Sequence, residues 1–259
     1  MEILDFFMIV TGGFAAGFVG SLMGLGGGLI AVPFLNLFMG IAMHNAAAAG
    51  LVSTLGVSCV AAGRYLRRGG LVDVSSALEI ELAAATGGLV GGVVVGYLKG
   101  ALLQVVFSGV LLYSGVQIFR SSFGVASVHE QGQSVVAWRT YLALALCFLA
   151  GVLSGLLGIG GGLVVVPVLH LVLGLPFKNS TATSNFMMGL TAVPALSGFV
   201  SRGQLDLGIS APLAAGVLVG ATFGSWLMPK ISTRWLKIIF SLLLLATAME
   251  MARKGIGTW

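Results

Sequence analysis

Two stretches of this chain carry the same glycine cluster. "GLGGGLIAVPFL" occupies residues 24–35 and "GIGGGLVVVPVL" occupies residues 158–169. The longer stretches 14–45 and 148–179 align without a gap, and 15 of their 32 positions are identical. Each glycine in the interior of a helix costs about 1 kcal/mol relative to alanine. The duplication therefore predicts a fold in which a helix is interrupted at two corresponding places.

The sequence around the clusters is too apolar for a water-soluble domain. Charged residues make up 8% of the chain and hydrophobic residues 58%, whereas soluble domains carry about 25% charged residues. Long apolar stretches separated by short polar breaks are typical of helical membrane proteins. We therefore predict an all-α polytopic membrane protein surrounded by membrane lipid.

The net charge of +5 does not indicate a nucleic-acid partner. The lysines and arginines lie mostly at the ends of apolar segments, where they determine membrane topology. Cys59 and Cys147 lie in apolar segments without metal-ligand spacing, so we predict no metal site and no cofactor.

The chain divides into two homologous halves, residues 1–119 and 139–259, joined by a polar loop over residues 120–138. Each half reads as five apolar pieces. These are about 4–24, 28–42, 45–66, 76–98 and 101–119, then 140–158, 162–176, 180–200, 207–228 and 235–251.

The second piece of each half is shorter than the roughly 20 residues that a bilayer requires. It either enters and returns, which gives eight crossings in total, or spans obliquely, which gives ten. Ten crossings divide the assigned Lys and Arg residues nine to four between the two sides, against eight to five for eight crossings. The more uneven division favours ten crossings, five in each half. An odd number of crossings places the two halves in opposite orientations, so we expect inverted repeats, an arrangement common in secondary transporters.

A helix break at membrane depth survives only where it is buried in protein or lines a wet cavity. It exposes backbone N–H groups that favour anions, so two adjacent breaks would form an anion site. The alternative explanation of the glycine clusters is that they allow neighbouring helices to pack closely. We assign that reading to the glycines outside the two clusters, namely Gly87, Gly88, Gly91, Gly92, Gly216, Gly220 and Gly224.

Polar residues follow the second cluster. Thr181, Ser184 and Asn185 share one face of a helix, where they either donate to the oxygens of an anion or hydrogen-bond between helices. Asn45 and Asn179 occupy corresponding positions and either bind the anion or cap a helix.

Ionisable residues in the apolar pieces are few. His170 stands where the first half has Asn36, so it serves either as a proton relay or as a packed side chain. Glu81 lies near a segment end, and we expect an interfacial carboxylate there, with a coupling proton as the alternative.

The doubled "GxGGGxxxVPxL" pattern resembles the sulfite exporter family, also called TauE/SafE. In that family a basic or polar residue and an "A-x-x-T-S" stretch follow the glycine motif. The second half matches this with "KNSTATSN" over residues 178–185, whereas the first half reads "HNAAAAG" over 44–50, with Ser53 and Thr54 one turn later. The resemblance implies a transporter of small sulfur-containing anions, such as sulfite or organosulfonates, in the bacterial inner membrane.

We therefore expect a secondary transporter that exports such an anion through a site near mid-membrane, and a homodimer is compatible with this reading. The candidate anion-binding residues are Gly26, Gly27, Gly28, Asn45, Gly160, Gly161, Gly162, Asn179, Thr183, Ser184 and Asn185.

Two other function classes stay open at this point. An anion channel would need no alternating access. An intramembrane enzyme would need a nucleophile with an activating partner, and none of the three histidines stands in a recognisable pairing, so we predict no catalytic residue.

No Walker motif is present. Transport would therefore depend on gradients, and at about 100 mV the expulsion of one negative charge gains about 2.3 kcal/mol.

Overall fold

The computed structural model describes residues 3–67, 71–72, 74–123, 137–231 and 233–257. Every regular element within these ranges is helical, which confirms the all-α prediction. The elements of the first half are α1 (Ile3–Met23), α2 (Gly28–Pro33), the π-helix η1 (Phe34–Phe38), α3 (Met43–Arg67), α4 (Val74–Val94), the short 3₁₀ helix η2 (Val95–Tyr97) and α5 (Gly100–Phe123). Those of the second half are α6 (Ala137–Leu157), α7 (Gly162–Pro167), the π-helix η3 (Val168–Val172), α8 (Phe177–Val200), α9 (Leu207–Leu227) and α10 (Thr233–Gly257).

The second apolar piece of each half is shorter than predicted. The helix formed by α2 and η1 ends at Phe38, and the one formed by α7 and η3 ends at Val172. Gly40 and Gly174 follow with φ angles of +66° and +75°. A left-handed glycine just beyond the last turn ends a helix, so both segments stop about four residues before the apolar sequence does.

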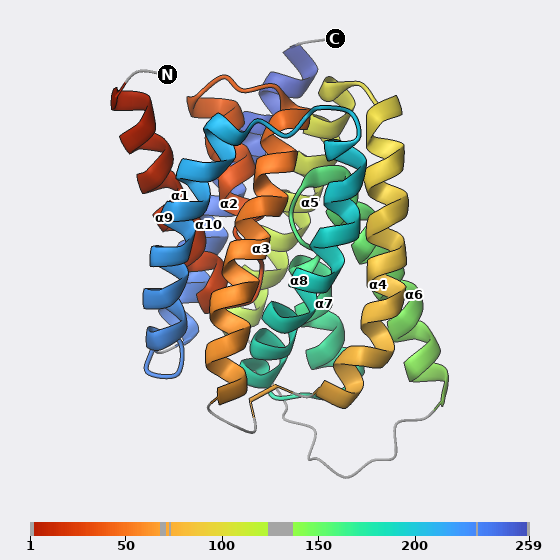
Figure 1. Ribbon diagram of the computed structural model, residues 1–259. Helices are drawn as coiled ribbons and strands as arrows, with labels where there is room; N and C mark the ends of the chain where they lie inside the picture. The colour runs from red at the N-terminus through yellow and green to blue at the C-terminus, as the bar shows by residue number, and fades with distance from the viewer. Residues whose placement is uncertain (1–2, 68–70, 73, 124–136, 232, 258–259) are drawn as a thin grey trace.

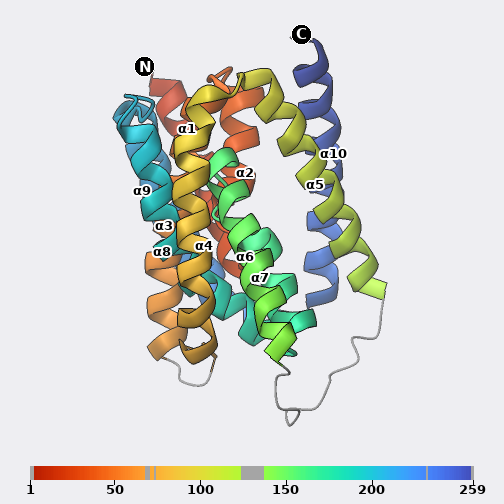
Figure 2. The ribbon, with the colours of Figure 1, turned by 90° about the vertical axis from the view of Figure 1, so that its right-hand side faces the viewer.

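The chain reverses direction from piece to piece (Figures 1 and 2). The N-terminus and the start of α3 lie at the upper end in Figure 1, so α2 and η1 lead back to the side where α1 began. The start of α6 lies at the lower end, so α6 runs opposite to α1. The direction of the helices thus agrees with inverted halves, while their homology stays a prediction from the sequence.

Five helices are long and apolar enough to cross a membrane by length and composition among the described residues. They are α1, α3, α6, α9 and the segment Ile80–Tyr97, and α2 with η1 forms one of two shorter apolar helices. The chain is therefore a multi-pass membrane protein. The number of crossings, ten by the division of charges, stays a prediction from the sequence.

Glycines outside the two clusters bring neighbouring helices into backbone contact. α1 packs on α9 and α4 packs on α6. A Cβ atom on Gly216 would overlap the carbonyl oxygen of Val10, and one on Gly87 would overlap that of Phe148. Equivalent contacts occur at Gly88, Gly91, Gly92, Gly220 and Gly224. The packing interpretation of these glycines is confirmed.

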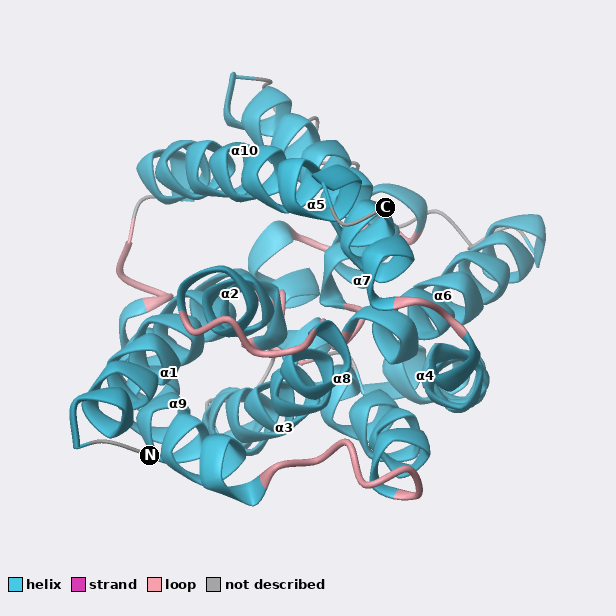
Figure 3. Cartoon of the chain, turned by 90° about the horizontal axis from the view of Figure 1, so that it is seen from above, coloured by secondary structure: helices cyan, strands magenta, loops and turns pink. Residues whose placement is uncertain are grey.

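Helices α3 and α8 pack against each other at the centre of the molecule, and α5 and α10 pair along one edge (Figure 3). Because both glycine clusters contact α3 or α8, the two central helices position the candidate site.

Candidate functional site

Both glycine clusters interrupt a helix, as predicted. The first break, between α1 and α2, has Gly24 and Gly26 at φ angles of +70° and +77°. The second, between α6 and α7, has Gly158, Gly160 and Gly161 at +74°, +87° and +74°. Left-handed backbone is unfavourable for residues with a side chain. The glycines are therefore required locally to stop each helix within the apolar sequence.

The two breaks lie directly against each other. A Cβ atom on Gly28 would overlap the carbonyl oxygen of Gly158, and a Cβ on Gly162 would overlap that of Gly24. These contacts correspond to each other, because residues 24 and 28 align with residues 158 and 162. Only hydrogen atoms fit between the breaks, so this crossing of the two glycine clusters needs glycine on both sides. We call it the glycine crossing.

Thr54 of α3 ties the two breaks together. Its Oγ1 accepts a hydrogen bond from the amide of Gly28 at 3.3 Å. The same hydroxyl lies 3.0 Å from the carbonyl oxygen of Gly50 and 3.3 Å from that of Ile159. Thr54 is not among the predicted binding residues, because its contact with Ile159 joins the two halves of the chain and leaves no signal in the local sequence.

Ser184 and Asn185 of α8 hold the first break from the other side. Ser184 Oγ donates to the carbonyl oxygen of Gly24 at 2.8 Å. Asn185 Nδ2 donates to the carbonyl oxygens of Ser21 and Thr181, each at 3.1 Å. In this conformation both side chains donate hydrogen bonds to backbone carbonyls of their own or a neighbouring helix. Hydrogen bonding between helices is the alternative role that the sequence left open for them.

Other polar atoms near the breaks have no partner among the described residues. The hydroxyls of Ser53, Ser154 and Thr181 and the Oδ1 atom of Asn185 are buried and form no hydrogen bond there. Ser53 Oγ occupies the space that a Cβ on Gly27 would need. Buried polar groups without a partner are uncommon in folded proteins, so this group marks a place where further hydrogen bonds can form.

Backbone amides at the breaks add further donors. Within the part of the chain that the structure describes, the N–H groups of Gly26, Gly27, Gly160 and Gly161 donate to no acceptor. Amide and hydroxyl donors together suit the oxygen atoms of an anion. The glycine crossing therefore holds unused donors contributed by both halves.

The remaining predicted residues lie beside the crossing. Thr183 is fully buried in α8. Asn45 and Asn179 are half-buried in the first turns of α3 and α8, two residues before Ala47 and Thr181. Ala47 and Thr181 contact the breaks. Side chains two residues apart leave a helix on different faces, so the two asparagines do not share that contact face.

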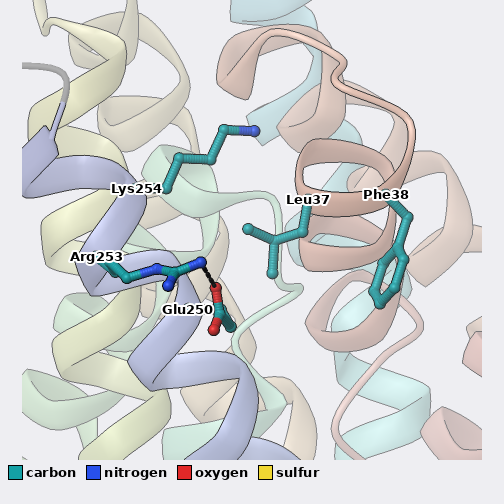
Figure 4. Close-up of a pocket in the computed structure, with 5 residues that line it drawn as sticks. All are labelled: Leu37, Phe38, Glu250, Arg253 and Lys254. Carbon is teal, nitrogen blue, oxygen red and sulfur yellow. Dashed lines mark ion pairs between the residues drawn. The ribbon is translucent and has the colours of Figure 1, made fainter.

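The crossing is closed to solvent in this conformation. Thr181, Ser184 and Asn185 are at most 1% exposed. A cavity of about 450 Å³ lies elsewhere, between η1 and the end of α10, and is lined by Leu37, Phe38, Glu250, Arg253 and Lys254 (Figure 4). None of the predicted site residues lines it. An anion would therefore reach the crossing only after α3, α8 or the two breaks move.

His170 has a structural explanation. Its Nδ1 atom lies 2.8 Å from the carbonyl oxygen of Leu175. Asn36, at the corresponding position of the first half, donates from Nδ2 to the carbonyl oxygen of Ile41 at 2.8 Å. Both side chains bond to a backbone carbonyl five residues ahead and close the turn after a π-helix. A role for His170 in proton transfer stays a prediction from the sequence.

We expect His170→Asn to keep the stability of the protein and His170→Leu to lower it. Asparagine can donate to Leu175 as Asn36 does to Ile41, whereas leucine removes a hydrogen bond worth about 1 kcal/mol. Thermal unfolding of both purified variants measures this. Equal losses in the two variants would exclude the turn-closing role. A pH-dependent activity that disappears in His170→Asn would instead favour the relay.

Glu81 is covered by neighbouring helices, and its place at the membrane interface stays a prediction from the sequence. It is 4% exposed and packs where α4 meets α6 and α8. Neighbouring helices cover this turn, which the short sequence distance to the start of α4 does not reveal.

Comparison with known proteins gives one family. Residues 9–251 match the family described as "Sulfite exporter TauE/SafE". No solved structure matches the chain.

The chain is also similar to individual proteins. The "Probable membrane transporter protein YunE" of Bacillus subtilis (strain 168) is 24% identical over 272 residues, which cover 98% of this chain and 99% of that protein. A "Probable membrane transporter protein" of Xylella fastidiosa (strain 9a5c) is 24% identical and covers 96% of this chain and 95% of its own. "Sulfite exporter TauE/SafE family protein 5" of Arabidopsis thaliana is 29% identical over 147 residues, 56% of this chain and 32% of that protein. These names agree with a role other than catalysis.

Proposed function

Because the chain belongs to the sulfite exporter TauE/SafE family, we propose that it is a secondary transporter of a small sulfur-containing anion. The anion is sulfite or an organosulfonate such as sulfoacetate, and it is exported across the inner membrane of a bacterium. The observation that carries this proposal is the glycine crossing, where two helix breaks meet beside buried hydroxyls that have no partner among the described residues.

The anion takes the donors that the closed conformation leaves unused. These are the amides of the glycines and the hydroxyls of Ser53 and Thr181. Ser184 and Asn185 join them when the first break moves away from α8 and releases their present carbonyl partners. The proposed site consists of Gly26, Gly27, Gly28, Gly160, Gly161, Gly162, Thr183, Ser184 and Asn185, with Ser53, Thr54 and Thr181 added and with Asn45 and Asn179 at its edge.

The burial of the crossing favours a carrier over a channel. A channel needs a continuous wet path, whereas the polar side chains at the crossing are at most 1% exposed and the breaks are in backbone contact. In alternating access a site near mid-membrane opens to one side at a time. The described conformation corresponds to a closed state of such a cycle.

The unpartnered hydroxyls allow a sharp test. We expect Ser53→Ala and Thr181→Val to leave folding intact, because each removes a hydroxyl that bonds to nothing in the closed state. Each is expected to weaken anion binding by about tenfold or more, since a hydrogen bond to a charged group contributes about 1.5–3 kcal/mol. Thermal shift and flux into proteoliposomes would be measured with sulfite, sulfate, sulfoacetate, taurine and thiosulfate.

Ser197→Ala is the matched control. Ser197 is an exposed residue of the same helix as Thr181, and its hydroxyl bonds only to the carbonyl of Pro194. The Ser197→Ala variant should bind the anion with the affinity of the wild type. If both Ser53→Ala and Thr181→Val bound the anion with wild-type affinity, the glycine crossing would be excluded as the anion-binding site. Absence of binding and flux for all five compounds would contradict the proposed function.

A further inference from the structure

The carboxyl group of Glu81 is buried within the helix bundle and does not belong to the glycine crossing. Glu81 Oε1 accepts a hydrogen bond from Thr191 Oγ1 of α8 at 2.7 Å. The second oxygen, Oε2, is buried and has no partner among the described residues. Structural hydrogen bonding alone would be served as well by glutamine. The acid differs from glutamine in that it can bind and release a proton, so this exchange is the property that needs explanation.

No positive charge faces this carboxyl group in the described part of the chain. The group that α6 contributes is the thiol of Cys147, and α8 contributes the hydroxyl of Thr191. On α4 itself, the neighbours one turn away are Ala77 and Ala84. Glu81 forms no ion pair with a described lysine, arginine or histidine. A carboxylate buried without a counter-charge is costly, so the closed conformation favours the neutral acid.

Glu81 is linked to the proposed anion site through α8. Its partner Thr191 follows Ser184 by seven residues, which is two helical turns and about 10 Å along the axis. Both side chains leave the same face of α8. At about 10 Å and an effective dielectric constant of about 20, two like charges interact strongly enough to change an affinity on the order of tenfold. An anion at the crossing and an ionised Glu81 therefore disfavour each other.

We propose that Glu81 is the proton-binding residue of the transport cycle, taking up one proton from water as the anion binds and releasing it to water on the other side. The proposal rests on the proposed anion transport. Uptake converts the carboxylate and a hydronium ion into the carboxylic acid and water, and release reverses this. By thermodynamic linkage the anion favours the protonated acid, and the protonated acid favours the anion by the same factor. Anion and proton therefore move together, and each turnover carries one negative charge fewer than the anion alone.

Glu81→Gln tests the proposal in proteoliposomes loaded with a pH-sensitive dye. Glutamine keeps the size of the side chain and an oxygen that can accept from Thr191. We expect the wild type to move protons in the same direction as sulfite. Glu81→Gln should retain sulfite exchange at equal concentrations within about twofold, while its sulfite-driven proton movement falls to the level of empty liposomes. Proton movement at the wild-type ratio to sulfite in this variant would overturn the proposal.

Glu250→Gln is the matched control, because Glu250 is exposed and paired with Arg253 at 3.1 Å. It should couple protons to sulfite like the wild type, and a loss of coupling there would also contradict the assignment to Glu81.

Infrared spectroscopy gives a readout that does not depend on transport, and its first part uses the wild-type protein alone. In wild-type protein at a pH alkaline enough to ionise part of Glu81 before sulfite is added, sulfite should increase the absorbance of protonated carboxyl groups, and Glu81→Gln should lack that increase. No change in the wild type, or the same change in a folded Glu81→Gln protein, would overturn the proposal. If sulfite neither binds nor moves, the proposed function fails instead. A protonated carboxyl band that is present without sulfite and lost in Glu81→Gln would then still identify Glu81 as the buried acid.

Discussion

Replacing Gly28 with alanine is expected to destabilise the protein severely, by about 3 kcal/mol or more, and to abolish transport. The new Cβ would overlap the carbonyl oxygen of Gly158, and the atoms on both sides of this contact belong to the backbone. Backbone cannot move away as a flexible side chain can, so the overlap has to separate the two breaks. Thermal unfolding of the purified protein and sulfite flux in proteoliposomes measure the two effects.

Gly63→Ala makes the same chemical change without the contact. Gly63 is an exposed residue of α3, and a Cβ there meets nothing within 4 Å. Alanine is the better helix former, so this variant should be as stable as the wild type or more stable by about 0.5–1 kcal/mol. If Gly28→Ala behaved like Gly63→Ala, the glycine crossing would not be a close contact in the folded protein.

Replacing Thr54 with valine should give the second largest loss. Valine has nearly the same shape, so the change removes the hydroxyl alone. The amide of Gly28 loses its acceptor, and the carbonyls of Gly50 and Ile159 lose a donor. A buried group without its partner costs about 1–3 kcal/mol. We expect a lower free energy of unfolding by an amount in this range, together with reduced flux because the two breaks are no longer tied together.

Thr86→Val controls for the change of threonine to valine. Thr86 is an exposed residue of α4, and its hydroxyl bonds only to carbonyls of its own helix, at Leu82 and Ala83. Surface substitutions of this kind usually stay within about 0.5 kcal/mol of the wild type. A Thr54→Val variant as stable as Thr86→Val would mean that the bridge between the breaks contributes nothing to the fold.

The ten apolar pieces could be predicted from the sequence because their causes are local. A run of apolar residues long enough for a bilayer forms a helix wherever it lies, and the observed helices begin and end within a few residues of the predicted pieces in most cases. The clearest error concerns residues 28–42 and 162–176, where Gly40 and Gly174 end the helices early. A single glycine near the end of an apolar run is a weaker signal than three in succession.

Part of the candidate site could also be predicted, because its causes are local in the sequence. The glycine clusters carry a strong local signal, and the breaks are where the sequence places them. Ser184 and Asn185 were also selected, but their partners, Gly24 and Ser21, lie 160 and 164 positions away. No spacing rule within one helix identifies such partners. Thr54 was missed because its importance depends on Ile159, in the other half of the chain.

The sequence by itself determined the class of protein and the positions of its helix breaks, since apolar length and the cost of consecutive glycines act within one segment. Only the tertiary structure decided that the breaks touch, that Glu81 is buried and that Ser53 and Thr181 have hydroxyls without a partner among the described residues. Whether a polar group is satisfied or exposed depends on segments far away in the chain, and these are brought together only by folding.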